Sequence, residues 1–209
     1  MTAPFVPPVM SDVVVDESHW NSTPNLALAK AAGIAAIIFK ATQGTGFVDP
    51  TFASRVAMAQ EAGLLVGAYH FLDGSDPVAQ MRRFLGVTAA AKAPLLLALD
   101  FEPNPSSQAM PIQAGGAAST VHSKTGVWPV IYTGRWMLSA PNAILAECPL
   151  WLAEYGSAPI CPPGWSQWKL WQHTASATVS GIGVCDRNRF AGSVADLDAW
   201  WHAQTTRRA

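Results

Sequence analysis

Two carboxylates end an apolar run in the middle of the chain. The run Leu95 to Leu99 is followed by Asp100, Phe101 and Glu102. Because side chains alternate along a strand, Asp100 and Glu102 lie on one face, about 6.6 Å apart at ~3.3 Å per residue. Charges at the end of a buried strand cost free energy unless they are paired or used. The spacing therefore predicts acid/base chemistry at the end of this strand.

Polar and aromatic side chains also follow other predicted strands. They are Asp16, Lys40, Tyr69, His70, Phe71, Tyr132, Trp151, Gln172 and Asp186. In β/α barrels, catalytic side chains gather at the carboxyl ends of the strands. A proton donor, further acids and aromatic rings that pack on sugar faces are what glycoside cleavage requires.

Structural roles compete with these functional ones. Lys40 is more easily explained as the cation that neutralises the acids, and His70 as a hydrogen-bonded core histidine. Asp16 could cap the loop that follows it, and Asp186 could pair with Arg187. For Asp100 and Glu102 no structural role is evident, since burying two like charges brings no benefit.

Strands and helices alternate in the first half of the chain. Strands are predicted at 13–15, 34–40, 64–71, 95–99, 127–132, 149–153, 169–172 and 183–186. Helices are predicted at 25–32, at 51–62 and after Asp76-Pro77, and a helix at 107–124 is expected to be broken by Pro111 and Gly115-Gly116. The later connections are too short for full crossover helices. We therefore expect a single irregular TIM-like β/α barrel of eight strands, with reduced helices in its C-terminal part.

The barrel is expected to span residues 12–209, after an extended, proline-containing arm at 1–11. Of the 209 residues, 50% are hydrophobic and 13% are charged, which is enough for a large core. The net charge of −1 and the lack of a basic stripe argue against nucleic acid as a partner. The three cysteines have no CxxC spacing, so we expect no metal or cofactor. Their spacing does not decide whether a disulfide forms.

No apolar run reaches the ~18 residues of a membrane span, so no membrane insertion is expected. The first basic residue is Lys30, so the positive region of a secretory signal is missing. We expect synthesis in the cytoplasm and action on the cell wall or periplasm after release or non-classical export. A phage endolysin, an injected effector and a non-classically exported enzyme remain open. We expect a monomer.

Several short motifs follow one another in order over residues 12 to 200. They are Asp16-Glu17-Ser18-His19-Trp20, Lys40-Ala41-Thr42-Gln43-Gly44, Asp49-Pro50-Thr51-Phe52, Gly67-Ala68-Tyr69-His70-Phe71, Leu99-Asp100-Phe101-Glu102, Tyr132-Thr133, Leu150-Trp151-Leu152-Ala153, Leu170-Trp171-Gln172 and Asp186-Arg187-Asn188-Arg189-Phe190. This series resembles glycoside hydrolase family 25, the Chalaropsis-type lysozymes. Glu17 departs from it, since the family often has an apolar residue there.

The resemblance implies an N-acetylmuramidase, which hydrolyses the β-1,4 bond between N-acetylmuramic acid and N-acetylglucosamine in peptidoglycan. By the same resemblance, Glu102 matches the general acid, Asp100 its partner carboxylate, and Asp16 and Asp186 the other active-site acids. The residues expected to contact substrate are Tyr69, Phe71, Tyr132, Trp151, Gln172 and Lys40.

The route to the anomeric carbon has three alternatives. A carboxylate could attack it, could activate water for inversion, or could orient the substrate's own N-acetyl group. Two acids at i and i+2 favour the last, with Asp100 holding the acetamido group.

Two other function classes are weighed against the enzyme. A catalytically inactive barrel that binds cell-wall carbohydrate would not need the pair Asp100 and Glu102. A metal-dependent hydrolase would need clustered histidines, and His19 and His70 are too few and too separated.

Overall fold

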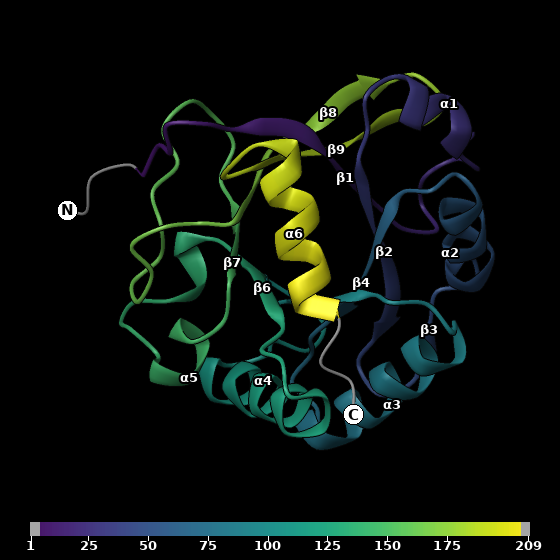
Figure 1. The fold of residues 1–209 in the computed structure, drawn as a ribbon. Coiled ribbons are helices and arrows are strands. Elements are labelled where there is room, and N and C mark those ends of the chain that lie inside the picture. Colours follow the sequence, from purple (N-terminus) through teal and green to yellow (C-terminus); the bar gives the residue numbers. More distant parts are fainter. Residues whose placement is uncertain (1–4, 206–209) are drawn as a thin grey trace.

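The computed structural model describes residues 5–205, which form a closed barrel with helices around it (Figure 1). The strands are β1 (Ser11–Glu17), β2 (Ala36–Gln43), β3 (Phe47–Val48), β4 (Leu65–Phe71), β5 (Leu96–Asp100), β6 (Val130–Thr133), β7 (Leu150–Ala153), β8 (Leu170–Val179) and β9 (Gly183–Phe190). Their order is β1-β9-β8-β7-β6-β5-β4-β2-β3, and the ring closes because β1 also pairs with β2. The short β3 only pairs with β2 and stands outside the ring. The predicted eight-stranded barrel is confirmed.

One strand of the ring runs against the others. β9 pairs antiparallel with both β1 and β8, whereas the remaining ring strands are parallel. The prediction that the last strand ends at Asp186 is wrong, because β9 continues to Phe190 and Asp186 lies opposite Asp16 within it. β8 and β9 form a hairpin, so the first half of β9 lies level with the carboxyl ends of the parallel strands. We call that end of the barrel the mouth.

Helices cover the barrel unevenly. They are α1 (Leu26–Ala31), α2 (Phe52–Glu61), α3 (Pro77–Ala90), α4 (Pro111–Thr125), the 3-10 helix η1 (Arg135–Met137), α5 (Ala143–Ala146) and α6 (Val194–Thr205). Full-length crossover helices follow β4 and β5, and only short segments connect β6 to β9, as the spacing had predicted. In Figure 1, α2, α3 and α4 flank the strands, whereas α6 lies across the centre of the ring. None of the described helices has the length and apolar character to cross a membrane.

The predicted break in α4 is wrong, since the helix is continuous from Pro111 to Thr125. Pro111 occupies the first turn, where a backbone N–H has no helical partner in any case. A Cβ on Gly116 would lie 3.3 Å from the Pro77 side chain, and one on Gly115 3.6 Å from that of Asn142. The two glycines therefore allow close packing of α4 against its neighbours rather than interrupting it.

The strand that carries the acid pair has the expected alternation. Leu97, Leu99 and Phe101 belong to the cluster packed under the helices, whereas Leu96 and Ala98 belong to the cluster inside the barrel. Helix α6, which the sequence analysis did not predict, adds Trp201 to the interior cluster. The strand is thus buried on both sides, and only its end is free to carry polar groups.

Before β1, residues 5–10 have no regular secondary structure, and Ser11 already belongs to the strand. The ring of Phe5 packs edge-on against Trp168, with ring centroids 5.9 Å apart. The backbone carbonyl of Phe5 accepts a 2.9 Å hydrogen bond from the Trp168 indole. The first part of the predicted arm, residues 1–4, lies outside the described residues.

Candidate active site

The mouth of the barrel holds a cavity of about 190 Å³. Its lining residues are Asp16, Tyr69, Asp100, Glu102, Tyr132, Trp151, Tyr155, Gln172 and Asp186. All four predicted acids are among them, together with four of the six residues predicted to contact substrate. The chain has only three tyrosines, and all three line this cavity.

Asp16 is the last but one residue of β1, and its carboxyl group accepts several hydrogen bonds. Its carboxyl oxygens accept bonds from the Gln172 side-chain amide at 3.1 and 3.2 Å and from that of Asn188 at 2.7 Å. The amide oxygen of Gln172 accepts the hydroxyls of Tyr132 (2.7 Å) and Tyr155 (3.0 Å). These contacts join β1, β6, β8, β9 and the segment after β7, so the orientation of Asp16 is fixed.

Asp16 and Asp186 form an acid pair with a hydrogen bond between them. Burial raises the pKa of Asp16 well above its usual value, and the charge of Asp186 raises it further. Burial also raises the pKa of Asp186, although the bond from Asp16 opposes that rise. Two neighbouring carboxyl groups disfavour each other's negative charge, which explains why the charge of Asp186 raises the pKa of Asp16.

Asp100 is buried with one oxygen unused. Its Oδ1 has no hydrogen-bond partner among the described residues, although a buried carboxylate oxygen normally has one. Burial raises the pKa of Asp100 well above its usual value, the charge of Glu102 adds to the rise, and Lys40 opposes it. This oxygen is itself buried, in a residue that lines the cavity, so Asp100 is the site acid whose hydrogen bonding is incomplete within the described residues.

Glu102 lies two residues past Asp100, just after the end of β5, and is half-buried. Burial raises its pKa, the positive charge of Lys40 opposes this rise, and the charge of Asp186 reinforces it. A glutamic acid with a raised pKa keeps its proton at a pH where an exposed one has lost it. This is the property that a general acid needs.

Comparison with known proteins agrees with this geometry. The model of the family described as glycosyl hydrolases family 25 matches residues 15–182. The chain belongs to this family. Lysozyme M1 of Streptomyces globisporus is 33% identical over 207 residues, covering 88% of this chain and 69% of that protein. The N,O-diacetylmuramidase of Chalaropsis sp. is 30% identical over 208 residues, covering 87% and 95%. The crystal structure of the bacterial lysozyme from Streptomyces coelicolor aligns with a TM-score of 0.82 at 32% identity, covering 93% of this chain and 99% of that one.

Lys40 and Phe71, which were predicted to contact substrate, do not line the cavity of this family 25 barrel. Lys40 donates a 2.7 Å hydrogen bond to the Gln43 side chain. Its ammonium lies 4.9 Å from the ring centre of Phe71 and 5.7 Å from that of Phe47. Lys40 still acts on the site through its charge, which opposes the rise in pKa of Asp100 and Glu102.

Two residues of the site were missing from the sequence-based prediction. Tyr155 lines the cavity although 61% of its surface is exposed. Asn188 is fully buried and connects Asp16 to the Trp151 indole, which donates a 2.6 Å bond to its side-chain oxygen. Asn188 lies in one of the motifs that resemble the family, but its pairing with Asp16 depends on the register of β9 against β1.

The departure at Glu17 has a structural explanation. Glu17 is buried and accepts a 3.2 Å bond from Arg55 on α2. Arg55 also donates to the backbone carbonyls of Ser18 (2.6 Å) and Asn21 (2.7 Å). Burial raises the pKa of Glu17 to about 7 against the opposing charge of Arg55. The ion pair holds the loop after β1 in place beside the cavity.

His70 is a core histidine rather than a catalyst. It is fully buried, and its ring nitrogens bond the Thr42 hydroxyl (2.7 Å) and the Gln80 side-chain oxygen (2.9 Å). Burial lowers its pKa to about 4, so it is neutral over most of the pH range. Within residues 5–205, no group of three or more His, Cys, Asp or Glu side chains is arranged to hold a metal ion.

Proposed function

We propose that Glu102 is the general acid of a muramidase that hydrolyses the β-1,4 bond between N-acetylmuramic acid and N-acetylglucosamine. Membership of family 25, with relatives named lysozyme and N,O-diacetylmuramidase, supports muramidase activity on peptidoglycan. The single observation that carries the residue assignment is the position of Glu102, which lies half-buried just past the end of β5 and lines a cavity with three further acids.

In the first step, Glu102 donates its proton to the oxygen of the bond that breaks. The leaving sugar then departs as a neutral alcohol, and positive charge develops at the anomeric carbon of the muramic acid ring. The oxygen of the neighbouring N-acetyl group attacks this carbon and closes a five-membered ring. Asp100 accepts a bond from the acetamido N–H through its unpartnered Oδ1, which orients the attacking oxygen.

In the second step, Glu102 acts as the base. As a carboxylate, it takes a proton from a water molecule that attacks the anomeric carbon, and the acetamido oxygen leaves. The anomeric carbon is displaced twice, so its configuration is retained. Asp16 holds Gln172 and Asn188 in position around the reacting ring, and Asp186 lies opposite Asp16 in the pairing of β1 with β9.

Replacement of the proton donor tests the assignment. Glu102→Gln keeps the shape of the side chain but cannot donate as an acid, so we expect clearing of a peptidoglycan suspension to fall by about 10²–10⁴-fold. Glu154→Gln is the matched control, because Glu154 pairs with Arg135 near the surface and does not line the cavity. Clearing by Glu102→Gln at the rate of the control would overturn the assignment of the acid.

The route through the acetamido group has its own test. Proton NMR of soluble glycan fragments during the first turnovers should detect the retained β-anomer before mutarotation. Initial release of the α-anomer would mean that water attacks directly, and Asp100 would then have another role. The new reducing ends should be muramic acid, as borohydride reduction and mass spectrometry would establish. A wild-type protein that binds glycan but releases no reducing ends would instead be a carbohydrate-binding barrel.

We further propose that the protein acts as a monomer on wall or periplasmic peptidoglycan, reached after release or non-classical export. In support, the described residues of one chain supply the whole lining of the cavity. Light scattering during size-exclusion chromatography tests the first point, with a dimer mass as the contrary result. Cell fractionation tests the second, and enzyme found only in the cytoplasm throughout growth and lysis would contradict it.

A further inference from the structure

An exposed group of aromatic rings lies beside the cavity but not in its lining. We call His19, Trp20 and Phe47 the aromatic shelf. The ring centre of His19 lies 4.6 Å from that of Trp20 and 5.3 Å from that of Phe47. Trp20 is 85% exposed and Phe47 38% exposed. Large aromatic side chains normally bury their rings, so a group left open to solvent marks a surface that binds something.

The shelf is held by a buried carboxylate. Asp49 accepts bonds from the backbone N–H of His19 (2.8 Å) and from its ring Nδ1 (2.9 Å). The other oxygen of Asp49 accepts the N–H and the hydroxyl of Thr51 at 2.9 and 2.7 Å. Ser18 and Asn21 close a tight turn on either side of Trp20. The backbone of the turn that carries Trp20 and the ring of His19 are therefore fixed before any ligand arrives.

The shelf lies at the mouth of the barrel. Trp20 belongs to the loop directly after β1, four residues past Asp16, and Phe47 lies on β3 against the end of β2. Lys40 connects the shelf to the acids, since its ammonium lies between the rings of Phe47 and Phe71, and Phe71 is paired with Asp100. Lys40 and Phe71 thus lie between the shelf and the acids.

The opposite rim of the cavity carries another exposed aromatic residue, Tyr155. It follows β7, and in the strand order β7 is four strands away from β2 in both directions around the ring. Tyr155 and Phe47 therefore lie on opposite sides of the cavity. A linear ligand that crosses the acids from the Tyr155 side leaves the cavity on the side of the shelf.

We propose that the aromatic shelf is a glycan subsite, where Trp20 stacks on a sugar ring of the strand beyond the ring held among the acids. This inference rests on the proposed muramidase function. The cavity of about 190 Å³ is smaller than the ~300–1,000 Å³ of sites that enclose a drug-sized ligand, so a polymer must continue over its rim. Sugar rings present C–H faces that pack on aromatic rings, and the shelf exposes such rings on a turn whose backbone is fixed.

Binding to fragments of different length tests the proposal. Glu102→Gln protein prevents turnover, and the probes are peptide-free glycan fragments of two and six sugars measured by calorimetry. Adding Trp20→Ala should weaken binding of the six-sugar fragment by about tenfold or more, because that fragment reaches the shelf. Binding of the two-sugar fragment should stay within about twofold, because its two rings can be held at the acids and on the Tyr155 side without reaching the shelf. Trp20→Tyr retains an aromatic ring and should recover most of the affinity.

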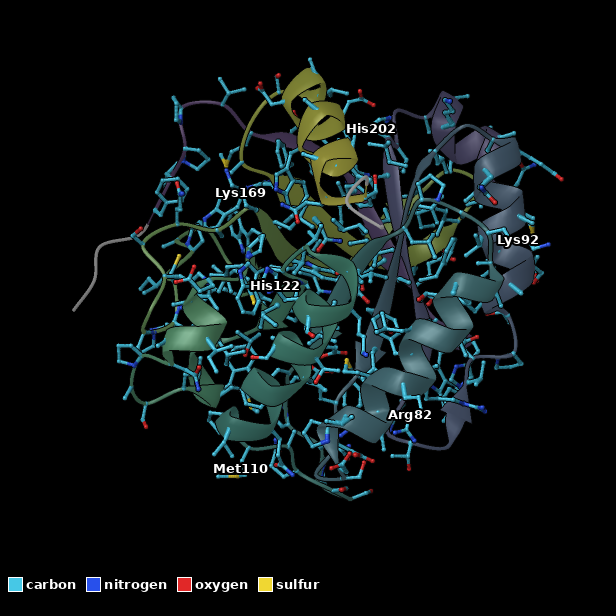
Figure 2. All side chains as sticks on the ribbon, turned by 60° about the horizontal axis from the view of Figure 1, so that its bottom comes forward. Arg82, Lys92, Met110, His122, Lys169 and His202 are labelled. Atoms are coloured by element: carbon cyan, nitrogen blue, oxygen red, sulfur yellow. The ribbon has the colours of Figure 1, made fainter. Side chains whose placement is uncertain are left out.

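Trp128→Ala is the matched control. Trp128 also stacks on a histidine, His122, with ring centres 4.0 Å apart, but it precedes β6 at the end of the barrel away from the mouth. In Figure 2, His122 lies nearer to α6 along α4 than Met110 does. Thermal unfolding of each variant verifies that it is folded, and Trp128→Ala should leave binding of both fragments unchanged.

The outcomes separate the shelf from the active site. A loss that is equal for both fragments, or no loss for the six-sugar fragment, would overturn the shelf while the muramidase function stands. A wild-type protein that releases no reducing ends from peptidoglycan would overturn the muramidase function and the shelf with it. Length-dependent loss in an enzyme that cleaves its substrate supports both.

Discussion

Single residues in the cavity differ because their surroundings differ. Asp16 accepts bonds from two amide groups and lies opposite Asp186, whereas Asp100 has an oxygen with no partner among the described residues. Glu102 is less buried than Asp100 and lies past the end of the strand. Similar acids placed in unlike environments take different roles. The arrangement suits one residue that donates a proton, one that accepts a bond from substrate, and two that orient the site.

The unpartnered carboxyl of Asp100 is expected to lower stability. The pKa of this carboxyl is higher in the folded protein than its ordinary value of 3.8. At a pH between the ordinary pKa and the raised one, the folded state therefore binds more protons than the unfolded state. Stability then falls as the pH rises through this window. Asp100→Asn removes the charge, so it should raise the melting temperature relative to wild type at pH 8 and have less effect at pH 4. Activity should fall by about 10²-fold or more, since an electrostatic contact with the transition state is lost.

Melting temperatures between pH 4 and 8, with peptidoglycan clearing beside them, measure both effects. Asp198→Asn on the exposed face of α6 is the control, and its effect should be small at every pH. A difference between Asp100→Asn and wild type that stays constant with pH would mean that the Asp100 carboxyl carries no extra cost in the folded state.

Residues of the site could be predicted from the sequence where a strand pattern placed them. The alternation from Leu95 to Glu102 identified the acid pair, because a buried strand leaves only its end for polar groups. Tyr155 and Asn188 were missed since their roles arise from contacts with Gln172 and Asp16, far away in the chain. Such contacts depend on strand register, which short apolar runs do not specify.

At the scale of elements, order and type were predicted better than direction and continuity. The strand that contains Asp186 was found, but a run of a few residues does not indicate that it returns antiparallel in a hairpin. The break expected in α4 rested on the low helix propensity of Gly115 and Gly116. Packing against α3 and the Asn142 side chain outweighs that propensity. Helix α6 was overlooked although Ser193 and Asp196 cap each other at its start.

Glycines that do not serve packing should be replaceable. Gly86 lies exposed within α3, and a Cβ there would meet nothing within 4 Å. Gly86→Ala should therefore increase the free energy of unfolding by about 0.5–1 kcal/mol, as expected for alanine over glycine in a helix. Chemical denaturation measures it, with the slope against denaturant concentration unchanged.

Gly181→Ala is the opposing case. Gly181 has a φ of +85°, and a Cβ there would lie 2.4 Å from the Asn25 carbonyl oxygen. Because that oxygen belongs to the backbone, the clash can be relieved only if the backbone moves. This variant should be less stable than wild type. If Gly86→Ala is also destabilising, then α3 at Gly86 packs against something beyond the described chain.

At the scale of the whole molecule, the two ends of the barrel have different tasks. The mouth collects acids, amides and rings, whereas the other end is filled by apolar side chains and covered by α6 (Figure 1). Trp201 and Leu197 of α6 join the interior cluster with residues from the strands. The helix thus completes the core on which the ring of strands, and with it the geometry of the mouth, depends.

Loss of the Trp201 ring should therefore destabilise the barrel as a unit. Trp201 is 1% exposed, and its indole donates a 3.2 Å bond to the Val66 carbonyl, so Trp201→Ala leaves a cavity and an unpaired acceptor. We expect the free energy of unfolding to fall by about 3–5 kcal/mol. Trp200→Ala on the same helix is the control and should cost less, because Trp200 is only partly buried against Phe190. Denaturation followed by both circular dichroism and peptidoglycan clearing should give coincident midpoints. If clearing is lost at lower denaturant than the fold, α6 supports the mouth separately from the rest of the barrel.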